Sequence, residues 1–431
     1  MTSAILILVA VFVLLLLSNV PISVCIGMAT VLTMLMSMPP EPAVTQVAQK
    51  IATGLDSFAL LAIPFFILSG QLMGRGGIAR RLINLAKALI GMLPGGLAYV
   101  NIVACMLFGA ISGSAVAATS AIGSFMIPEM NKAGYDKNFS AAVNATSSTT
   151  GLLIPPSNIL IVYSLASGSV SVAALFIAGY LPGVLTGLLL ISVCAIAAMV
   201  NNYRGGEKVP FLEIVKRTGD AFLSLLLIVI VIGGIVAGFF TATEAAAIAV
   251  LYSLFLAVVV YREVKIKDLP EILIQTVITN AVVMLLIGTS MALSWILAYE
   301  NIPQTISAAL IGMTGNKIII LLIINIILLF VGTFMDATPA VLIFTPIFLP
   351  VVIELGLDPL HFGILMILNL CIGICTPPVG AVLFVGCSVA DTKITHIIKW
   401  LLPFFAAMIV SLMLVTYIPE ITLWLPRLLG F

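Results

Sequence analysis

The chain contains 431 residues, of which 62% are hydrophobic and only 8% are charged, and its mean hydropathy is +1.29. Soluble domains carry about 25% charged residues, so this composition predicts an integral membrane protein in a lipid bilayer. The net charge of +1 provides no basic surface for nucleic acid. No HExxH motif, Gly-x-Ser-x-Gly motif or phosphate-binding glycine loop occurs, so we expect neither an enzyme nor a bound cofactor.

Ten segments are apolar enough to be interpreted as membrane spans, because about 20 apolar residues cross about 30 Å of hydrocarbon. In chain order these spans are 3–19, 21–38, 58–74, 138–165, 171–201, 220–239, 243–261, 276–298, 359–388 and 398–419. Segments 41–57 and 262–275 are amphipathic and are expected at the membrane interface. The pattern predicts an all-α polytopic membrane protein.

Two further apolar segments, 97–130 and 318–353, are too long for one span. Each carries small polar residues near its middle, Ser112-Gly-Ser114 in the first and Gly332-Thr-Phe-Met-Asp336 in the second. We interpret both segments as re-entrant helical hairpins that enter and leave the membrane on the same side. Irregular backbone at membrane depth is tolerated only where it is buried in protein or lines a cavity, so the hairpin tips are candidate functional sites.

The distribution of lysine and arginine supports this arrangement. If neither hairpin crosses the membrane, fifteen of the 18 basic residues lie on one side, and only Lys50, Lys317 and Arg427 lie on the other. The positive-inside rule then places the larger group in the cytoplasm and both termini in the periplasm. Counting one hairpin as a single crossing would invert every later loop and remove the asymmetry.

The two halves of the chain are related by a shift of 222 positions. Gly134 has a counterpart in Gly356, Gly151 in Gly373, and Pro155-Pro156 in Pro377-Pro378. Each half contains five crossings and one hairpin, and because five is odd the second copy is inserted upside down. Inverted repeats with matching Gly and Pro interruptions are typical of secondary transporters that alternate access around a central site.

The Pro-Pro pairs predict helix breaks within two spans, since proline removes a backbone donor and clashes with the preceding turn. Hydroxyl and carbonyl oxygens at such breaks are suitable ligands for a small alkali cation, and the half-helix N-termini beyond them can face an anion. We therefore expect each hairpin tip and its broken helix to hold one Na⁺, with an anionic substrate between them. The hydroxyls of residues 147–150 can alternatively satisfy backbone groups within the helix.

Two acidic residues have more than one interpretation. Asp336 lies at the second hairpin tip, where it can bind a cation, carry a proton or cap the following helix, and these alternatives remain open. Glu244 completes a Thr-x-x-Glu capping box at the start of a span, so we favour a structural role there. No arginine occurs in the hairpins or broken helices, so carboxylate recognition is expected to use backbone amides, hydroxyls and amide side chains.

Six stretches resemble the large membrane (M) subunit of the tripartite ATP-independent periplasmic (TRAP) transporters. The resemblance covers essentially the whole chain. The stretches occur in this order: Ile63-Pro-Phe-Phe-Ile-Leu-Ser-Gly70, Phe108-Gly-Ala-Ile-Ser-Gly-Ser-Ala-Val-Ala-Ala118, Gly151-Leu-Leu-Ile-Pro-Pro-Ser157, Gly238-Phe-Phe-Thr-Ala-Thr-Glu-Ala-Ala246, Gly332-Thr-Phe-Met-Asp336 and Thr376-Pro-Pro-Val-Gly380. The sequence departs from the family at Ala242, where proline is expected, and this change leaves the capping box intact.

The resemblance implies an elevator-type ion-transporter fold in the bacterial inner membrane. It further implies Na⁺-coupled uptake of an organic acid (a C4-dicarboxylate, a sialic acid or a sugar-derived keto acid) delivered by a periplasmic substrate-binding protein. A small four-helix membrane subunit is the other implied partner. The corresponding division is an N-terminal scaffold with an interfacial arm (1–57), a first-repeat transport core (58–201), a linker with scaffold spans (202–275) and a second-repeat core (276–431).

Carried over to this sequence, the cation-binding residues are Ser112, Ser114, Ser148, Thr149, Gly151, Gly332, Thr333, Asp336, Gly373 and Thr376. The expected substrate-binding residues are Pro156, Ser157, Asn158, Pro378 and Gly380. The coupling ion is Na⁺, although the residues do not separate sodium from proton coupling. A stand-alone Na⁺/carboxylate carrier of the same superfamily is the main alternative, and a channel with re-entrant loops is the weaker one.

Overall fold

The computed structural model describes residues 2–206 and 209–431. Within these ranges the chain is helical throughout, with no strand, and seven helices are long and apolar enough to cross a membrane. This confirms the prediction of an all-α polytopic membrane protein. The shorter apolar helices belong mainly to the hairpins and to the interrupted helices, where a polar break divides one apolar segment into two pieces.

The first half of the chain contains ten α-helices and one 3₁₀ turn. They are α1 (Thr2–Leu17), α2 (Ile22–Ser37), α3 (Pro40–Leu55), η1 (Phe58–Leu61), α4 (Ala62–Arg75), α5 (Ile78–Ile90), α6 (Gly96–Ser112), α7 (Ala115–Lys132), α8 (Lys137–Thr150), α9 (Asn158–Ser167) and α10 (Val172–Asn201). The sequence analysis did not identify α5, whose apolar residues lie on one face of a helix rich in basic residues.

The second half is also helical, with one short π-helix (η2) and one 3₁₀ turn (η3) among its α-helices. Its elements are α11 (Phe211–Val236), α12 (Ala242–Phe255), η2 (Leu256–Val260), η3 (Ile266–Asp268), α13 (Leu269–Tyr299), α14 (Ile302–Met313), α15 (Lys317–Gly332), α16 (Ala337–Glu354), α17 (Pro359–Gly373), α18 (Ala381–Ala390), α19 (Ile394–Tyr417) and α20 (Glu420–Leu428). Helices α14 and α20 are also additions to the elements expected from the sequence.

Both long apolar segments fold as helical hairpins. Helix α6 ends at Ser112 and is capped by Gly113, whose φ of +62° suits glycine. Ser114 is the N-cap of α7 and accepts a hydrogen bond from the Ala117 amide at 3.2 Å. The second hairpin turns over Thr333–Met335, and Asp336 takes the N-cap position of α16. The polar residues that interrupt the hydropathy pattern are therefore the residues that reverse the chain.

Both spans with a Pro-Pro pair are broken, as the sequence predicts. Helix α8 ends at Thr150 and α9 starts at Asn158, while α17 ends at Gly373 and α18 starts at Ala381. The order hairpin, helix, break and half-helix is therefore the same in both halves. The opposite membrane orientation of the two halves stays a prediction.

The two halves pack into each other at their centre. The second helix of the first hairpin, α7, packs against α18, which follows the break of the second half. Likewise α16 of the second hairpin packs against α9, which follows the break of the first half. Each hairpin therefore contacts the half-helix of the opposite repeat, and this exchange brings the two tips into one region.

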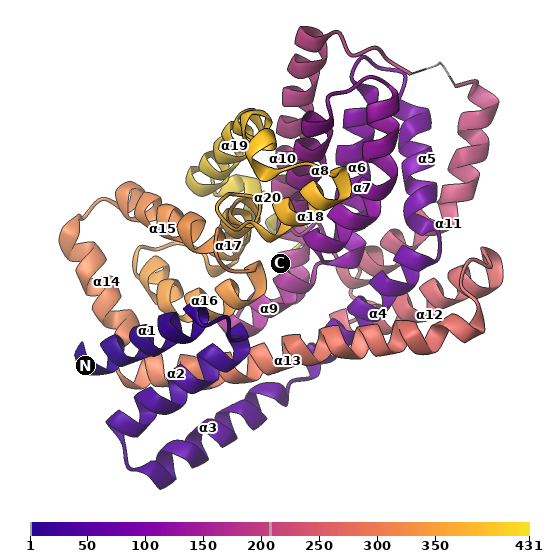
Figure 1. Ribbon diagram of the computed structural model, residues 1–431. Helices are drawn as coiled ribbons and strands as arrows, with labels where there is room; N and C mark the ends of the chain where they lie inside the picture. Colours follow the sequence, from indigo (N-terminus) through magenta and orange to yellow (C-terminus); the bar gives the residue numbers. More distant parts are fainter. Residues whose placement is uncertain (1, 207–208) are drawn as a thin grey trace.

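The long helix α13 connects this centre with the N-terminal helices. It packs against α2, α3, α4 and α16, and it runs below the hairpin helices in the view of Figure 1. Because α13 begins at Leu269, the expected boundary at 275/276 falls inside a continuous helix. Hydropathy identified only the apolar part of α13, from residue 276 onward. The helix starts seven residues earlier, and Pro270 fits its first turn. Segment 262–275 thus includes η3 and the first turns of α13, and its position at the membrane interface stays a prediction.

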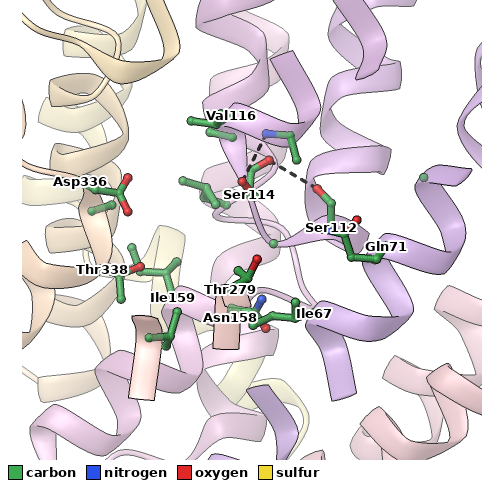
Figure 2. Close-up of a pocket in the computed structure, with 18 of the residues that line it drawn as sticks. Ile67, Gln71, Ser112, Ser114, Val116, Asn158, Ile159, Thr279, Asp336 and Thr338 are labelled. Atoms are coloured by element: carbon green, nitrogen blue, oxygen red, sulfur yellow. Dashed lines mark hydrogen bonds between the residues drawn. The ribbon is translucent and has the colours of Figure 1, made fainter. Parts of the chain in front are cut away.

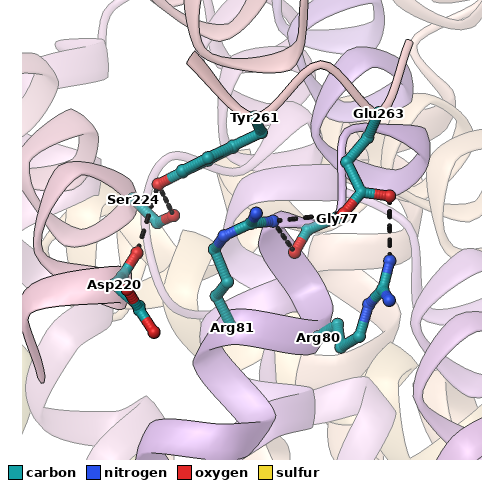
Figure 3. A network of polar contacts seen from close by, with 7 residues as sticks. All are labelled: Gly77, Arg80, Arg81, Asp220, Ser224, Tyr261 and Glu263. Carbon is teal, nitrogen blue, oxygen red and sulfur yellow. Dashed lines mark hydrogen bonds and ion pairs between the residues drawn. The ribbon is translucent and has the colours of Figure 1, made fainter. Parts of the chain in front are cut away.

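The corner between α4 and α5 is fixed to the segment that follows α12. Arg80 binds Glu263 at 2.9 Å, and the Arg81 guanidinium lies 3.6 Å from the centre of the Tyr261 ring (Figure 3). Gly77 forms the corner itself with a φ of +71°. These contacts connect the start of α5 with residues 261–263, which belong to the expected scaffold.

Candidate functional site

One cavity lies between the two hairpin tips. Its volume is about 550 Å³, and its wall includes Ser112, Gly113 and Ser114 from the first tip and Asp336 and Thr338 from the second. Figure 2 shows Asp336 on one side of this space, with Ser112 and Ser114 on the other. The structure thus brings together the two polar interruptions that the sequence places more than 200 residues apart.

Helices α4 and α13 close the cavity on another side. On α4 the lining side chains Ile63, Ile67, Gln71 and Arg75 are spaced four residues apart, so they share one helix face. Thr279 and Val283 contribute a similar face of α13. The resulting wall is mostly apolar, with a small number of polar groups that point into the space, which is the usual composition of a small-molecule site.

The first tip touches the start of α9. A Cβ atom added to Gly113 would lie 2.7 Å from Nδ2 of Asn158, so the glycine allows this close approach. Asn158 lines the cavity, and its buried Oδ1 has no hydrogen-bond partner among the described residues. The hydroxyl of the neighbouring Ser157 is also buried without a partner. Buried polar atoms are normally satisfied, so these two oxygens indicate a place for a ligand or water.

The second tip contacts the second break in a comparable way. The Gly380 amide, which precedes α18, donates a hydrogen bond to the Thr333 carbonyl at 3.2 Å. Asp336 is exposed to the cavity and makes no side-chain capping bond to α16 and no ion pair within the described chain. Its carboxylate oxygens are therefore free to bind a cation or a proton that enters the cavity.

Two glycine pairs allow each hairpin to cross its broken helix at close range. A Cβ atom on Gly151 would lie 2.4 Å from Cα of Gly109, and one on Gly373 would lie 2.5 Å from Cα of Gly332. The first helix of each hairpin thus touches, backbone to backbone, the end of the helix that precedes the break. No side chain fits at either crossing, which explains the matched glycines at 151 and 373.

The remaining expected residues lie around the cavity without lining it. Ser148 and Thr149 are fully buried and donate to backbone carbonyls of their own helix, and Ser148 also accepts a bond from Thr119 at 2.7 Å. Thr376 donates to the Ile372 carbonyl at 2.7 Å. For Ser148 and Thr149, such bonds to the preceding turn are the alternative role that the sequence left open.

The proline residues face different surroundings. Pro156 lies against side chains of α4, α11 and α12, whereas Pro378 is exposed at the second break. Gly380 is buried with a φ of +53°, a conformation that favours glycine. The assignment of Pro156, Pro378 and Gly380 to substrate binding stays a prediction.

The capping box of Glu244 is present at the start of α12. The Thr241 hydroxyl accepts a hydrogen bond from the Glu244 amide, and the Glu244 carboxylate accepts one from the Thr241 amide.

Sequence reasoning missed several cavity residues. Gln71, Arg75 and Thr279 line the space, although the sequence analysis assigned no arginine to the vicinity of the substrate. Arg75 pairs with Glu271 of α13 at 2.8 Å. The sequence did offer one signal, because residues 63, 67, 71 and 75 recur every four positions and so share one face of a helix. This spacing does not show which other elements pack against that face.

The fold and the cavity define a class of protein, namely a multi-pass membrane transporter with two helical hairpins and two interrupted helices. A comparison of solved structures supports this fold. The chain superposes on the YdaH transporter of Alcanivorax borkumensis with a TM-score of 0.64, over 90% of both chains and at 15% sequence identity. At this identity the similarity concerns the fold alone.

Residues 8–421 match the sequence model of the family described as tripartite ATP-independent periplasmic transporter, DctM component, and the chain belongs to this family. Three relatives match the chain over nearly their full length. The chain is 53% identical to the uncharacterized protein YgiK of Salmonella typhimurium, covering 97% of this chain and 96% of that protein. It is 42% identical to the C4-dicarboxylate TRAP transporter large permease protein DctM of Pseudomonas aeruginosa, covering 94% of each chain.

A third relative is the sialic acid TRAP transporter large permease protein SiaM of Vibrio cholerae, 42% identical over 89% of this chain and 90% of that protein. Membership in the family confirms the resemblance found in the motifs and shows that the chain is a permease subunit rather than an enzyme. The family also implies a small membrane subunit and a periplasmic binding protein as partners.

Proposed function

We propose that this protein is the large permease subunit of a Na⁺-coupled uptake system for an organic acid, which a periplasmic binding protein delivers. The observation that carries the proposal is the cavity between the two hairpin tips, whose wall includes Asp336 and Asn158. Relatives named for C4-dicarboxylate and sialic acid transport support the substrate class. Both are carboxylates, and the cavity is large enough for either.

Sodium coupling is supported by the chemistry of the tips. The first tip supplies the Ser112 and Ser114 hydroxyls beside Asn158, and the second supplies Thr333, Asp336 and the backbone around Gly380. Hydroxyl, carbonyl and carboxylate oxygens are hard ligands suited to a small cation. A cation bound at each tip would offset the negative charge of Asp336 and of the incoming substrate carboxylate.

Alternating access by an elevator movement is proposed on the basis of the packing. The hairpins and broken helices form one intertwined unit through the α7–α18 and α16–α9 contacts. Helices α2 and α3 contact α13 at its side, α1 packs against α2, and the three helices can remain in place as a scaffold. The cavity reaches Arg75 at the end of α4, which the charge distribution assigns to the cytoplasmic side.

Reconstitution tests the coupling and the delivery separately. Purified large and small membrane subunits in proteoliposomes are expected to accumulate the organic acid only with an inward sodium gradient and only with the binding protein present. Accumulation without the binding protein would favour the stand-alone carrier. Uptake driven equally well by a proton gradient in sodium-free buffer would refute the sodium coupling.

Arg75 is proposed to bind the substrate carboxylate. We expect Arg75→Gln to raise the KM for the organic acid about tenfold, because a hydrogen bond to a charged group contributes about 1.5–3 kcal/mol and this side chain is partly exposed. Arg427→Gln is the matched control, since Arg427 also pairs with an acidic residue at 2.9 Å but lies outside the cavity.

The ion pair between Arg75 and Glu271 allows the substrate-binding role of Arg75 to be separated from a structural role. If Arg75 binds the substrate, Glu271→Gln releases the guanidinium and should lower the KM or leave it unchanged. If Arg75 serves only to hold α4 against α13, both variants lose the same contact and should raise the KM alike. Uptake kinetics of the two variants therefore separate the two roles.

A further inference from the structure

A second cavity of about 480 Å³ lies away from the hairpin tips, beside the linker between the two halves. Helix α5 contributes Lys87 and Gly91 to its wall, and α11 contributes Arg217. The end of α7 contributes Glu129 and Lys132, and the linker contributes Gly206 and Val209. In Figure 1 this region lies where α11 stands beside α5.

The wall of this groove is basic. Among the described residues, three cationic side chains (Lys87, Lys132 and Arg217) and one carboxylate (Glu129) line it, and their net charge is 3 − 1 = +2. Lys87 pairs with Glu129 at 2.8 Å, and Arg217 pairs with Glu213 on its own helix. Lys132 is exposed and has no ion pair in the described part of the chain. Exposed pairs of this kind are weak, so the cations can turn toward a stronger anionic partner.

The backbone forms one side of the groove. The Gly206 amide donates to the Gly91 carbonyl at 3.0 Å, which fastens the linker to the turn after α5. A Cβ atom on Gly205 would lie 2.2 Å from the Met92 carbonyl oxygen, so only glycine allows this approach. The basic side chains are thus arranged around a backbone support rather than scattered over a loop.

Exposed apolar side chains flank the basic wall. Leu89 lies in the last turn of α5, and Met92 and Leu93 follow the helix. Phe211 and Leu212 begin α11, where they are 79% and 81% exposed. Helix α10 ends at Asn201 and α11 starts at Phe211, so the groove lies at the ends of membrane spans. A basic pocket with an apolar rim at this depth has the two surfaces that a phospholipid presents, a charged headgroup and acyl chains.

We propose that this groove binds the phosphate headgroup of an anionic phospholipid, with the acyl chains along residues 89–93 and the start of α11. Basic pockets between transmembrane helices on the cytoplasmic side bind such headgroups, and the charge distribution assigns this end of the helices to the cytoplasm. The exposed apolar rim favours a lipid over a free phosphate ion, which would gain nothing from it. The lipid would connect the first hairpin, the linker and α11.

The test compares two double variants of the full-length chain in mild detergent. Lys132→Gln/Arg217→Gln removes two groove cations, and Lys216→Gln/Lys399→Gln removes two exposed cations that do not line the groove. Binding is measured by titration with cardiolipin in phosphatidylcholine-containing micelles, and co-purified lipid is measured by native mass spectrometry. The groove variant is expected to bind cardiolipin about 30-fold more weakly, at about 1 kcal/mol for each basic residue, and to retain less anionic lipid than the wild type.

Three results would overturn the proposal. Equal weakening in both double variants would indicate general surface electrostatics. Unchanged binding in the groove variant would place the lipid elsewhere. Displacement of the bound cardiolipin by inorganic phosphate alone, at constant ionic strength, would indicate a site for a soluble anion. Circular dichroism and size-exclusion profiles equal to those of the wild type show that the variants are folded.

Discussion

Alanine at Gly151 or at Gly373 is expected to abolish transport. Each glycine lies where a hairpin crosses a broken helix, and an added Cβ would lie 2.4 Å and 2.5 Å, respectively, from a backbone Cα of the hairpin. The residue in contact is itself glycine, so no flexible side chain can move aside. Gly151 has a φ of −64°, which alanine adopts easily, so the effect is steric rather than conformational. Overpacking of this kind costs about 1–3 kcal/mol, and here it displaces the hairpin tip directly.

The controls are two helical glycines with open surroundings. An added Cβ at Gly233 of α11 or at Gly312 of α14 meets nothing within 4 Å. Alanine at either position should leave uptake unchanged and slightly favour the helix, since alanine exceeds glycine in helix propensity by about 1 kcal/mol. Uptake is measured in proteoliposomes at equal protein content. If Gly151→Ala and Gly373→Ala transport like these controls, the crossings do not position the tips.

Asp336→Asn is expected to reduce the apparent affinity for sodium by at least about tenfold. The carboxylate is exposed to the cavity without an ion pair in the described residues, so its charge is available to a cation. Two unit charges about 4 Å apart attract each other by about 1 kcal/mol in water and about 4 kcal/mol near a protein surface. Asparagine is an equally good N-cap residue, so the start of α16 should be preserved.

Glu244→Gln provides the comparison for this variant. Glu244 closes a capping box with Thr241, and glutamine supports the same box. Sodium titration of uptake should therefore give a shifted curve for Asp336→Asn and the wild-type curve for Glu244→Gln. Equal shifts in both would mean that the charge at the second tip has no specific part in cation binding. A shift of the pH profile without a change in sodium dependence would instead assign Asp336 to proton transfer.

Much of the local structure could be predicted because its causes are local. A Pro-Pro pair breaks a helix wherever it occurs, and Ser112-Gly-Ser114 interrupts an apolar segment with residues suited to a turn. These features located both hairpins and both breaks to within a few residues. Helix α5 was not predicted because basic residues interrupt its apolar sequence. The start of α13 was not predicted because its first turns are polar.

The composition of the cavity could not be predicted from the same reasoning. Gly109 gave no signal by itself, since its role depends on Gly151 lying directly across from it. Arg75 looked like an ordinary basic residue at the end of a span until α13 and the first hairpin were placed beside it. Hydroxyls such as that of Ser148 looked equally available in the sequence, yet the structure buries this one between α7 and α8.

The sequence by itself determined that the chain spans the membrane, where its helices turn and break, and which family it belongs to. These properties depend on hydrophobicity, on proline and glycine geometry and on short motifs, all of which act within a few residues along the chain. Only the tertiary structure decided that α7 packs with α18 and α16 with α9, and hence that both tips face one cavity. Such packing depends on side chains that meet across the repeats, and no spacing within one segment encodes it.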